Sequence, residues 1–374
     1  MKKTEIIAIY LPQFHRIPEN DMWWGEGFTE WTNVKKADPL FEGHLQPRIP
    51  LDGDYYDLSD KDVLLRQMRL ARDYGIDGFC FYHYWFKGRK LLEKPIEAIL
   101  NEDRLPIKFM LSWANEPWTR TWDGNRGAQT ILVDQDYGDE SDWIEHYKYW
   151  SQFFKREEYI KVDGRPVLAV YNPASVPNKR DMFALWNKCA TSDGFMNGLF
   201  IINTHRLPLD RELPFYGDAV FDFEPLISVS ERFNYLKRLK ACNKRQGCRC
   251  DNADYSYDVI DYGELCKIMT DRYAFSNIRH YLGFFFGWDN TPRRGIETKL
   301  IIDGNTPEIA EKFFDIQYGR SVKANNDFIF INAWNEWGEG AFIEPDEEYG
   351  FGYLESIKRV KDKYLAFIEE RCYV

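Results

Sequence analysis

Eight short apolar runs recur along the chain, separated by segments long enough to hold a helix. A short run that is rich in β-branched and aromatic residues is typical of a strand buried on both faces. The runs are Ile6–Tyr10, Gly78–Tyr82, Ile107–Leu111, Pro166–Val170, Leu199–Ile202, Ala219–Phe223, Leu282–Phe286 and Phe328–Ile331. Eight buried strands that alternate with helices predict an α/β fold of the (β/α)8 TIM barrel type.

Helical patterns in the intervening segments support this prediction. Residues 60–74 place apolar side chains on one broad stripe, with Asp60 suited to cap the start and Gly75 to end the helix. Similar patterns cover residues 142–154, 181–190, 306–318 and 353–370. The alternative is a doubly wound open sheet, but such sheets usually have fewer strands, and no glycine-rich phosphate turn follows the first run.

Two of the predicted strand-to-helix connections are long. Residues 12–58 follow the first strand and residues 226–275 follow the sixth. The first is too rich in aromatic residues to be disordered, and we expect both to lie over the face of the barrel where the strands end. We find no repeat, linker or low-complexity tract, so the 374 residues are expected to form one barrel domain over residues 1–374.

The charge and the apolar segments of the chain exclude several functions. A net charge of −11 argues against nucleic acid and anionic membrane surfaces as partners. No stretch reaches the roughly 18 apolar residues of a membrane helix, and the N-terminal residues lack a signal-peptide cleavage site, so a cytoplasmic protein is expected. The seven cysteines do not suggest a disulfide framework. Reduced loop thiols are the expected state of Cys242, Cys248 and Cys250, whose spacing differs from that of structural zinc sites.

The last strand runs directly into two carboxylates, Glu336 and Glu339, beside Trp334 and Trp337. Indole faces pack on sugar rings, and glycosidic cleavage needs one carboxyl group to protonate the leaving oxygen and usually a second group as nucleophile or base. If both acids enter a water-poor pocket, their proximity raises the pKa of at least one of them. The alternative is one functional acid and a bystander.

Other polar and aromatic residues follow the remaining strands. Trp113, Asn115 and Glu116 follow the third strand, whereas a similar Asn-Glu-Pro acid/base element follows the fourth strand in large retaining glycosidase families. Glu116 is therefore open to two main interpretations, a substrate-binding or a structural carboxylate, with a general acid as the lesser one. The further candidates for substrate binding are Tyr10, His15, His83, Tyr84, Trp85, Tyr171, His205, Glu224, Trp288, Trp334, Asn335 and Trp337. No nucleophile elbow or His-Glu-x-x-His motif occurs, and neither a metal nor a cofactor is expected.

Long strings of the chain resemble the WbsX proteins of bacterial polysaccharide gene clusters, which are often described as glycosyltransferases. The strings are Ala8–His15, Trp23–Trp31, Gly78–Phe86, Trp113–Glu116 and Asn335–Gly340. WbsX proteins are similar in turn to glycoside hydrolase family 99, the endo-α-mannosidases and endo-α-mannanases. That resemblance implies retention through a 1,2-anhydro sugar, with Glu336 as the base at the 2-hydroxyl and Glu339 as the general acid/base. Trp337-Gly338 departs from the Trp-His of family 99, which puts the same substrate in doubt.

Three functions remain open at the level of the sequence. The first is a retaining glycoside hydrolase that cleaves an α-linked, mannoside-like oligosaccharide or polysaccharide with Glu336 and Glu339. The second is a glycosyltransferase of surface-polysaccharide assembly, although the chain has neither a phosphate cradle nor a well-spaced Asp-x-Asp metal site. The third is a non-catalytic glycan-binding barrel, against which the paired acids argue. The sequence does not indicate the sugar, the linkage or the oligomeric state.

Overall fold

The computed structural model describes residues 2–120, 130–206, 216–234, 258–273, 278–298 and 300–372. Cys242, Cys248 and Cys250 lie outside these residues, so their expected state as loop thiols is not addressed by the structure. Within the described ranges, no helix combines the length and the apolar character that crossing a membrane requires.

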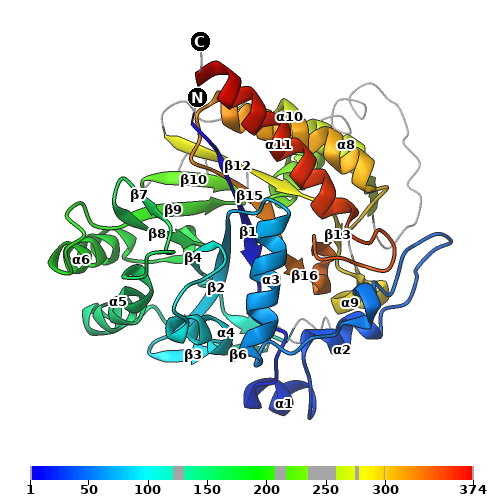
Figure 1. The fold of residues 1–374 in the computed structure, drawn as a ribbon. Coiled ribbons are helices and arrows are strands. Elements are labelled where there is room, and N and C mark those ends of the chain that lie inside the picture. Colours follow the sequence, from blue (N-terminus) through cyan, green and yellow to red (C-terminus); the bar gives the residue numbers. More distant parts are fainter. Residues whose placement is uncertain are drawn as a thin grey trace, which may run out of the picture.

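Eight parallel strands close into a barrel, as predicted (Figure 1). Each pairs with the next in chain order, and the last pairs with the first through the register Ile7↔Phe330. The barrel strands are β1 (Glu5–Tyr10), β2 (Gly78–Phe86), β4 (Lys108–Trp113), β8 (Arg165–Val170), β9 (Phe200–His205), β10 (Ala219–Asp222), β12 (Arg279–Phe285) and β15 (Phe328–Asn332). The (β/α)8 prediction is therefore confirmed.

The five predicted helices are present, with boundaries that agree within a few residues except at the C-terminal end of α10. They are α3 (Lys61–Asp73), α5 (Glu140–Phe154), α6 (Lys179–Ser192), α10 (Pro307–Lys323) and α11 (Gly352–Cys372). The Asp60 side chain caps α3 by accepting a hydrogen bond from the Asp62 amide. Gly75 follows that helix with a φ of 89°, a left-handed conformation that a glycine adopts without strain. Figure 1 shows α10 and α11 side by side, and Arg359 of α11 is ion-paired with Glu311 of α10.

The long connections contain more regular structure than the sequence suggested. The first holds two helices, α1 (Pro18–Trp24) and α2 (Glu30–Lys35), and the second holds a strand, β11 (Asp258–Asp261), and a helix, α8 (Tyr262–Asp271). Besides short 3₁₀ helices, the described residues also form α4 (Lys94–Ala98), α9 (Thr291–Arg294) and the short strands β3 (Arg89–Leu91), β5 (Trp118–Thr119), β6 (Ile131–Val133), β7 (Lys161–Val162), β13 (Trp288–Asp289), β14 (Leu300–Asp303), β16 (Asn335–Glu336) and β17 (Ala341–Phe342). β11, β14 and β13 form a separate three-stranded sheet.

Strand β2 is longer than predicted, and this changes the placement of several candidate residues. The sequence pattern predicted an end at Tyr82, but β2 continues to Phe86 and pairs there with β3 in a hairpin. His83, Tyr84 and Trp85 were expected just past the strand and instead belong to it, as Trp113 belongs to β4 and His205 to β9. Side chains within a strand alternate between its two faces, so only every second one of these residues points into the barrel.

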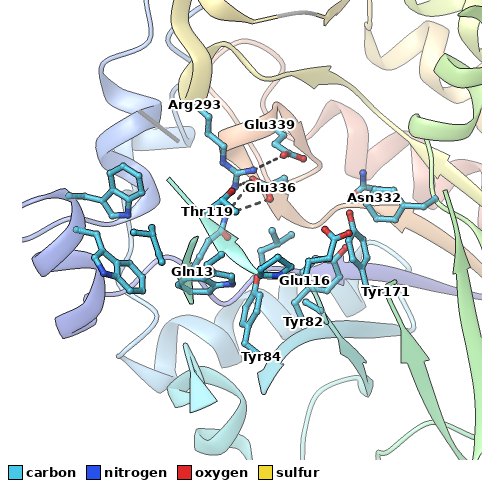
Figure 2. Close-up of a pocket in the computed structure, with 18 residues that line it drawn as sticks. Gln13, Tyr82, Tyr84, Glu116, Thr119, Tyr171, Arg293, Asn332, Glu336 and Glu339 are labelled. Atoms are coloured by element: carbon cyan, nitrogen blue, oxygen red, sulfur yellow. Dashed lines mark hydrogen bonds and ion pairs between the residues drawn. The ribbon is translucent and has the colours of Figure 1, made fainter. Parts of the chain in front are cut away.

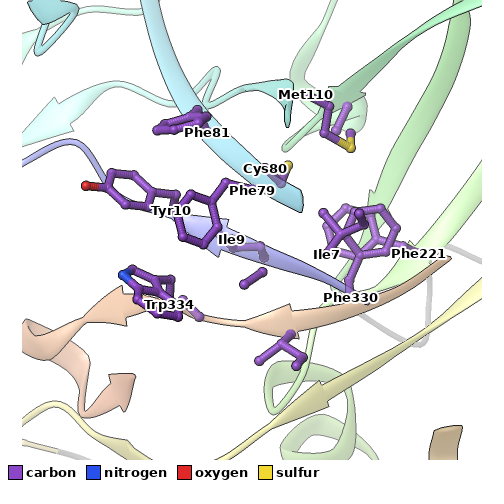
Figure 3. Packing of buried hydrophobic residues seen from close by; sticks show 14 of the residues in the cluster. Ile7, Ile9, Tyr10, Phe79, Cys80, Phe81, Met110, Phe221, Phe330 and Trp334 are labelled. Carbon is purple, nitrogen blue, oxygen red and sulfur yellow. The ribbon is translucent and has the colours of Figure 1, made fainter. Parts of the chain in front are cut away.

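Large side chains fill the barrel below the strand ends. Figure 3 shows Phe221 against Phe330, with ring centroids 4.3 Å apart, and Ile7 close to them. On the outer face of β1 and β2, Tyr10 packs against Phe79 and Phe81 with centroids 5.0 and 4.6 Å apart. The interior is therefore a packed core rather than a pore, and an open cavity can form only where the strands end.

Candidate active site

A cavity of about 270 Å³ opens at the carboxyl ends of the barrel strands (Figure 2). Its walls come from the ends of the barrel strands and from the segments that follow them, including helices α1 and α9. The lining residues are Leu11, Gln13, Trp23, Trp24, Tyr82, Tyr84, Ala114, Glu116, Pro117, Trp118, Thr119, Leu132, Tyr171, Phe223, Arg293, Asn332, Glu336 and Glu339. Aromatic rings and carboxylates thus face one space, which is the usual composition of a site with a few convergent polar groups on apolar walls.

The tight turn after β15 places Glu336 and Glu339 at this cavity. β16 and β17 form a two-residue antiparallel ladder, and a 3₁₀ turn, Trp337–Glu339, connects them. Gly340 ends the turn with a φ of 60°, in the left-handed region that favours glycine. The Asn335 side chain ties the turn to the end of β1, because its Oδ1 accepts from the Leu11 amide at 2.8 Å and its Nδ2 donates to the Leu11 carbonyl at 2.9 Å.

One guanidinium holds both carboxylates. Nη2 of Arg293 lies 2.9 Å from Glu336 Oε1, and Nη1 lies 2.7 Å from Glu339 Oε1. Nε of the same side chain donates to Glu30 Oε1 at 2.9 Å. The rigid fork of an arginine therefore fixes the carboxyl groups of the two candidate acids side by side, as the dashed lines in Figure 2 show.

The close approach of Arg293 and Glu30 requires a glycine at position 338. A Cβ built on Gly338 would lie 2.8 Å from Arg293 Nε and inside van der Waals contact with the Glu30 carboxylate. Glu30 is buried and held by Arg293 and Asn33, so it has little freedom to move away. The departure from Trp-His noted in the sequence therefore has a physical reason: an imidazole here would occupy the space of the Glu30–Arg293 ion pair.

Burial and charge set the protonation of this group. Burial is the largest influence on the pKa of Glu336 and of Glu339, and it raises both. Arg293 opposes this rise in each case, while the negative charge of Glu30 adds to it. Glu336 is 4% exposed and also lies within reach of the Gln13 amide, at 3.3 Å from Oε1. Glu336 and Glu339 therefore bind a proton more readily than isolated glutamates do.

A third carboxylate, Glu116, lies at another wall of the cavity. Its Oε1 accepts from Asn172 Nδ2 at 2.8 Å and pairs with Arg206 Nη1 at 2.9 Å. The Arg206 guanidinium in turn lies over the Tyr171 ring, 4.4 Å from its centroid. Asn115 fixes this region, because its amide group exchanges two hydrogen bonds with the backbone of Asn172, each 2.7 Å long.

Aromatic side chains form the wall near helix α1. Trp23 packs edge-on against Trp118 with ring centroids 6.0 Å apart, and Trp118 packs against Tyr84 at 5.1 Å. Tyr82 and Tyr84 point into the cavity from alternate positions of β2. Rings arranged in this way offer apolar surface that suits the face of a sugar.

Of the residues proposed from the sequence, Tyr84, Glu116, Tyr171, Glu336 and Glu339 line the cavity. Tyr10, His83, Trp85 and Trp113 do not, because they occupy strand positions that face the surrounding helices. The Tyr10 hydroxyl donates to Gln67 of α3 at 2.6 Å, and His83 and Trp85 both contact His146 of α5. The Trp113 ring packs against the Trp186 ring of α6, with centroids 5.8 Å apart.

His205 and Glu224 lie in a buried ionic group behind the barrel wall. Asp222 Oδ1 lies 2.8 Å from His205 Nδ1 and 2.9 Å from His280 Nε2, and Arg272 pairs with both Asp222 and Glu224. Ligand atoms of His205, Asp222 and His280 lie within 4.8 Å of one another, as metal ligands would. However, the Arg272 guanidinium already supplies the positive charge beside Asp222, and these groups fit a hydrogen-bonded ion network better than a metal site.

The remaining candidates lie around the cavity rather than in its lining. The indoles of Trp334 and Trp337 donate to Glu344, a residue that the sequence did not single out. Trp288 belongs to the small strand β13, Asn335 binds the end of β1, and His15 is fully buried near the start of the first connection. The principal lining residues absent from the sequence prediction are Gln13, Trp23, Trp24, Tyr82 and Arg293. The Trp-Trp pair within the long first connection was the available signal, whereas nothing in the local sequence distinguishes Arg293.

The sequence of the chain is similar to one protein family and to curated bacterial relatives. The family model described as glycosyltransferase WbsX matches residues 6–357. The protein WxcX from Xanthomonas campestris pv. campestris, in strains ATCC 33913 and B100, is 37% identical over 370 residues, which is 98% of this chain and 51% of WxcX. The chain thus spans about half the length of these curated relatives.

Two solved structures share the architecture over almost the whole chain. The family 99 (GH99) endo-α-mannosidase from Bacteroides thetaiotaomicron is 14% identical with a TM-score of 0.57, covering 98% of this chain and 99% of that one. A structure described as a glycoside hydrolase-like protein has a TM-score of 0.59 at 14% identity, covering 96% of this chain and 94% of that one. At this level of identity the likeness shows the barrel fold alone.

Proposed function

The chain belongs to the WbsX glycosyltransferase family, and from this premise we propose that it is a carbohydrate-active enzyme that cleaves an α-linked, mannoside-like glycan with retention. The observation that carries the proposal is the placement of Glu336 and Glu339 on one guanidinium at the wall of an aromatic-lined cavity. Hydrolysis of a glycoside needs one carboxyl group to protonate the leaving oxygen and usually a second group as nucleophile or base, and the closeness of this pair supports such a division of roles.

The two carboxyl groups have different surroundings, which suit different roles. The Glu336 side chain is 5% exposed and the Glu339 side chain is 24% exposed. The deeper Glu336, held by Arg293 and Gln13, suits a carboxylate base at the 2-hydroxyl of the sugar. The more accessible Glu339 suits the acid that protonates the leaving oxygen, because its side chain is the more exposed of the two. Burial raises the pKa of both carboxyl groups, so the two roles are assigned from exposure and contacts and not from the pKa shifts.

The proposed reaction has two steps that balance. In the first, Glu336 removes the proton of the 2-hydroxyl, O2 attacks C1, and the glycosidic bond breaks as Glu339 gives its proton to the leaving oxygen. In the second, Glu339 takes a proton from water, the water oxygen attacks C1, and Glu336 returns its proton to O2 as the three-membered ring opens. Each carboxyl ends in its starting state, and two inversions at C1 give net retention.

The chemistry of the cavity supports a neutral glycan as the substrate. Arg293, which lines the cavity, is paired with Glu30, Glu336 and Glu339, and Arg206 beside it is paired with Glu116. The aromatic wall offers apolar surface to a pyranose ring. The endo-α-mannosidase named among the structural neighbours makes α-mannosides the first substrates to test.

A glycosyltransferase is the second candidate, and the description of the family itself favours it. In that case the same carboxylates would act on a sugar from an activated donor, and an acceptor hydroxyl would replace the water. A third function, glycan binding without turnover, would use the aromatic walls alone.

One experiment separates these functions. The protein is incubated with a panel of α-mannosides and related oligosaccharides, first alone and then with sugar nucleotides, and products are identified by mass spectrometry and by NMR of the anomeric centre. Release of a new reducing end without donor, with retained configuration, is the expected result. Growth of the oligosaccharide only when donor is present would assign a transferase, and binding without product would leave a glycan-binding barrel.

A further inference from the structure

Glu344 is a buried carboxylate directly behind the candidate acids, and all of its hydrogen-bond partners shown here are neutral. Its Oε1 accepts from Gln67 Nε2 at 2.7 Å and from Trp334 Nε1 at 2.9 Å. Its Oε2 accepts from the Tyr56 hydroxyl at 2.7 Å and from Trp337 Nε1 at 2.8 Å. The residue is only 6% exposed, so two oxygens and four donors form a closed group.

The two indoles bound by Glu344 flank the segment that carries Glu336. Trp334 precedes Asn335-Glu336, and Trp337 starts the 3₁₀ turn that ends at Glu339. The Trp337 ring also stacks on Phe342 of β17, with centroids 3.6 Å apart and an interplanar angle of 15°. One side chain therefore fixes the residues on either side of Asn335-Glu336, and the second of them, Trp337, starts the turn that carries Glu339.

The other two partners connect this turn to separate parts of the barrel. Gln67 lies on α3, and its Oε1 accepts a hydrogen bond from the Tyr10 hydroxyl of β1 at 2.6 Å. Tyr56 comes from the first long connection, and its carbonyl accepts the Trp31 indole at 2.8 Å. Through Glu344, the turn after β15 is thus joined to β1, to α3 and to the connection that carries Glu30.

Neutral partners make this a costly place for a carboxylate. A buried charge is normally retained where a cation compensates it, and an apolar or neutral group of similar size would fold at lower cost. Burial accordingly raises the pKa of Glu344. A glutamine would not replace it, because one oxygen would become an NH₂ group, and in either orientation one indole N–H would face a donor.

We infer that Glu344 is a positioning residue of the active site, which holds Trp334 and Trp337 so that Glu336 and Glu339 share Arg293. The effect on turnover rests on the proposed function, whereas the effect on geometry does not. When two catalytic groups must act on one sugar, a displacement of about 1 Å lowers the reaction rate by about a hundredfold.

The test is the variant Glu344→Gln, measured by steady-state kinetics on the glycan that wild type turns over and by its crystal structure. We expect kcat to fall by about a hundredfold while KM stays near the wild-type value, since the aromatic walls are untouched. In the crystal structure, one indole is expected to leave its position and Glu336 or Glu339 to lose its contact with Arg293. Wild-type kcat, or unchanged positions of both glutamates, would overturn the inference.

Two further variants separate positioning from a general loss of stability. Glu158→Gln removes a partly buried carboxylate that binds Arg156 and the Leu105 amide, away from the cavity lining, and should reduce stability without changing kcat. Trp337→Phe removes one of the hydrogen bonds of Glu344. The fold-loss of kcat in the double variant with Glu344→Gln should therefore be smaller than the product of the fold-losses in the two single variants. A fold-loss of kcat in the double variant equal to that product would favour a merely structural role. So would a fall of kcat in Glu158→Gln that accompanies its fall in thermal stability.

The experiments distinguish a failure of the proposed function from a failure of the positioning role. If wild type turns over no glycan with or without a donor, the proposed function fails, and the crystal structure of Glu344→Gln still decides the inference. Displaced glutamates would support the positioning role, and an unmoved pair would reject it.

Discussion

At the scale of single residues, Arg293 is the centre of the candidate active site. It pairs with Glu30 from the first long connection and with Glu336 and Glu339 from the turn after β15. Because one cation faces three carboxyl groups, the site retains an excess of negative charge that is relieved when one carboxyl binds a proton. This is the state that general acid catalysis requires: one group able to donate and one able to accept.

The variant Glu339→Gln should abolish turnover and keep glycan binding. The amide has nearly the same size but cannot give a proton to the leaving oxygen, and loss of a general acid costs about 10²–10⁴-fold in rate. Turnover is measured on an oligosaccharide and binding by calorimetry, with the exposed Glu348→Gln as the matched control. Wild-type rates in Glu339→Gln would refute its role as the acid.

Replacing Arg293 should move the pH dependence of the reaction. Arg293 lowers the pKa of both Glu336 and Glu339, so Arg293→Gln raises both and shifts the two limbs of the kcat/KM profile to higher pH. Arg293→Lys keeps the charge and should leave the limbs closer to wild type while the rate falls, because a lysine lacks the fork. A profile that does not move in Arg293→Gln would show that neither limb reports these carboxyl groups.

At the scale of elements, strand alternation decides which side chains reach the cavity. Tyr82 and Tyr84 of β2 line it, while His83 and Trp85 between and beyond them contact His146 of α5. Helix α1 covers the same region from the first connection and contributes Trp23 and Trp24. The site is thus built from a rigid strand and a short helix that packs over it.

Removing an aromatic ring from α1 should weaken substrate binding more than catalysis. Trp23→Ala is expected to raise KM roughly two- to tenfold with little change in kcat, because a single aromatic contact contributes about 0.5–1.5 kcal/mol. Met22→Ala on the same helix is the control, since that side chain is 74% exposed and does not line the cavity. A fall in kcat alone would place Trp23 in the chemical step instead.

Strand β12 approaches β10 so closely that it needs a glycine. A Cβ on Gly283 would overlap the Asp222 carbonyl, which is backbone and cannot rotate away. Gly283→Ala should therefore lower the free energy of unfolding by about 1–3 kcal/mol or more, measured by denaturant titration. Gly263→Ala in the first turn of α8, where the nearest atom is a side-chain oxygen at 3.2 Å, should change it far less. Equal effects of the two variants would contradict this explanation.

At the scale of the whole molecule, the barrel brings the carboxyl ends of eight parallel strands to one rim. Residues far apart in the chain meet there, and Arg293 and Glu30 are separated by 263 positions. The burial that makes the site water-poor also makes its carboxyl groups costly to ionise. Stability and protonation are therefore linked through the same residues.

This linkage predicts how stability depends on pH. Burial raises the pKa of Glu344 to about 7, above the ordinary glutamate value that applies to the unfolded chain. Between those values the folded chain binds more protons than the unfolded chain, so this carboxyl contributes stability at low pH that is lost as pH rises through about 7. Glu344→Gln has no carboxyl group to titrate at this position and does not lose this stability. The Tm of the variant minus that of wild type should therefore be larger at about pH 8 than at about pH 5. Parallel Tm curves for the two proteins would contradict the raised pKa.

Local patterns in the sequence were sufficient to predict the barrel architecture. The buried runs, helix stripes and signals such as Asp60 and Gly75 depend on neighbouring residues only, and each corresponds to an element of the barrel. The same patterns placed Glu336 and Glu339 after the last strand, where the structure has them at the cavity wall.

The tertiary structure decided which residues meet. A strand end that moves by a few residues, as in β2, changes the face on which each following side chain lies, so His83 and Trp85 could not be assigned to a face from their order alone. Arg293, Glu30 and Glu344 belong to the site through contacts across the closed barrel, and no spacing in the chain encodes such contacts. Short-range periodicity therefore determines the elements, whereas the grouping of Glu30, Glu336 and Glu339 around Arg293 depends on distances that exist only after the barrel has closed.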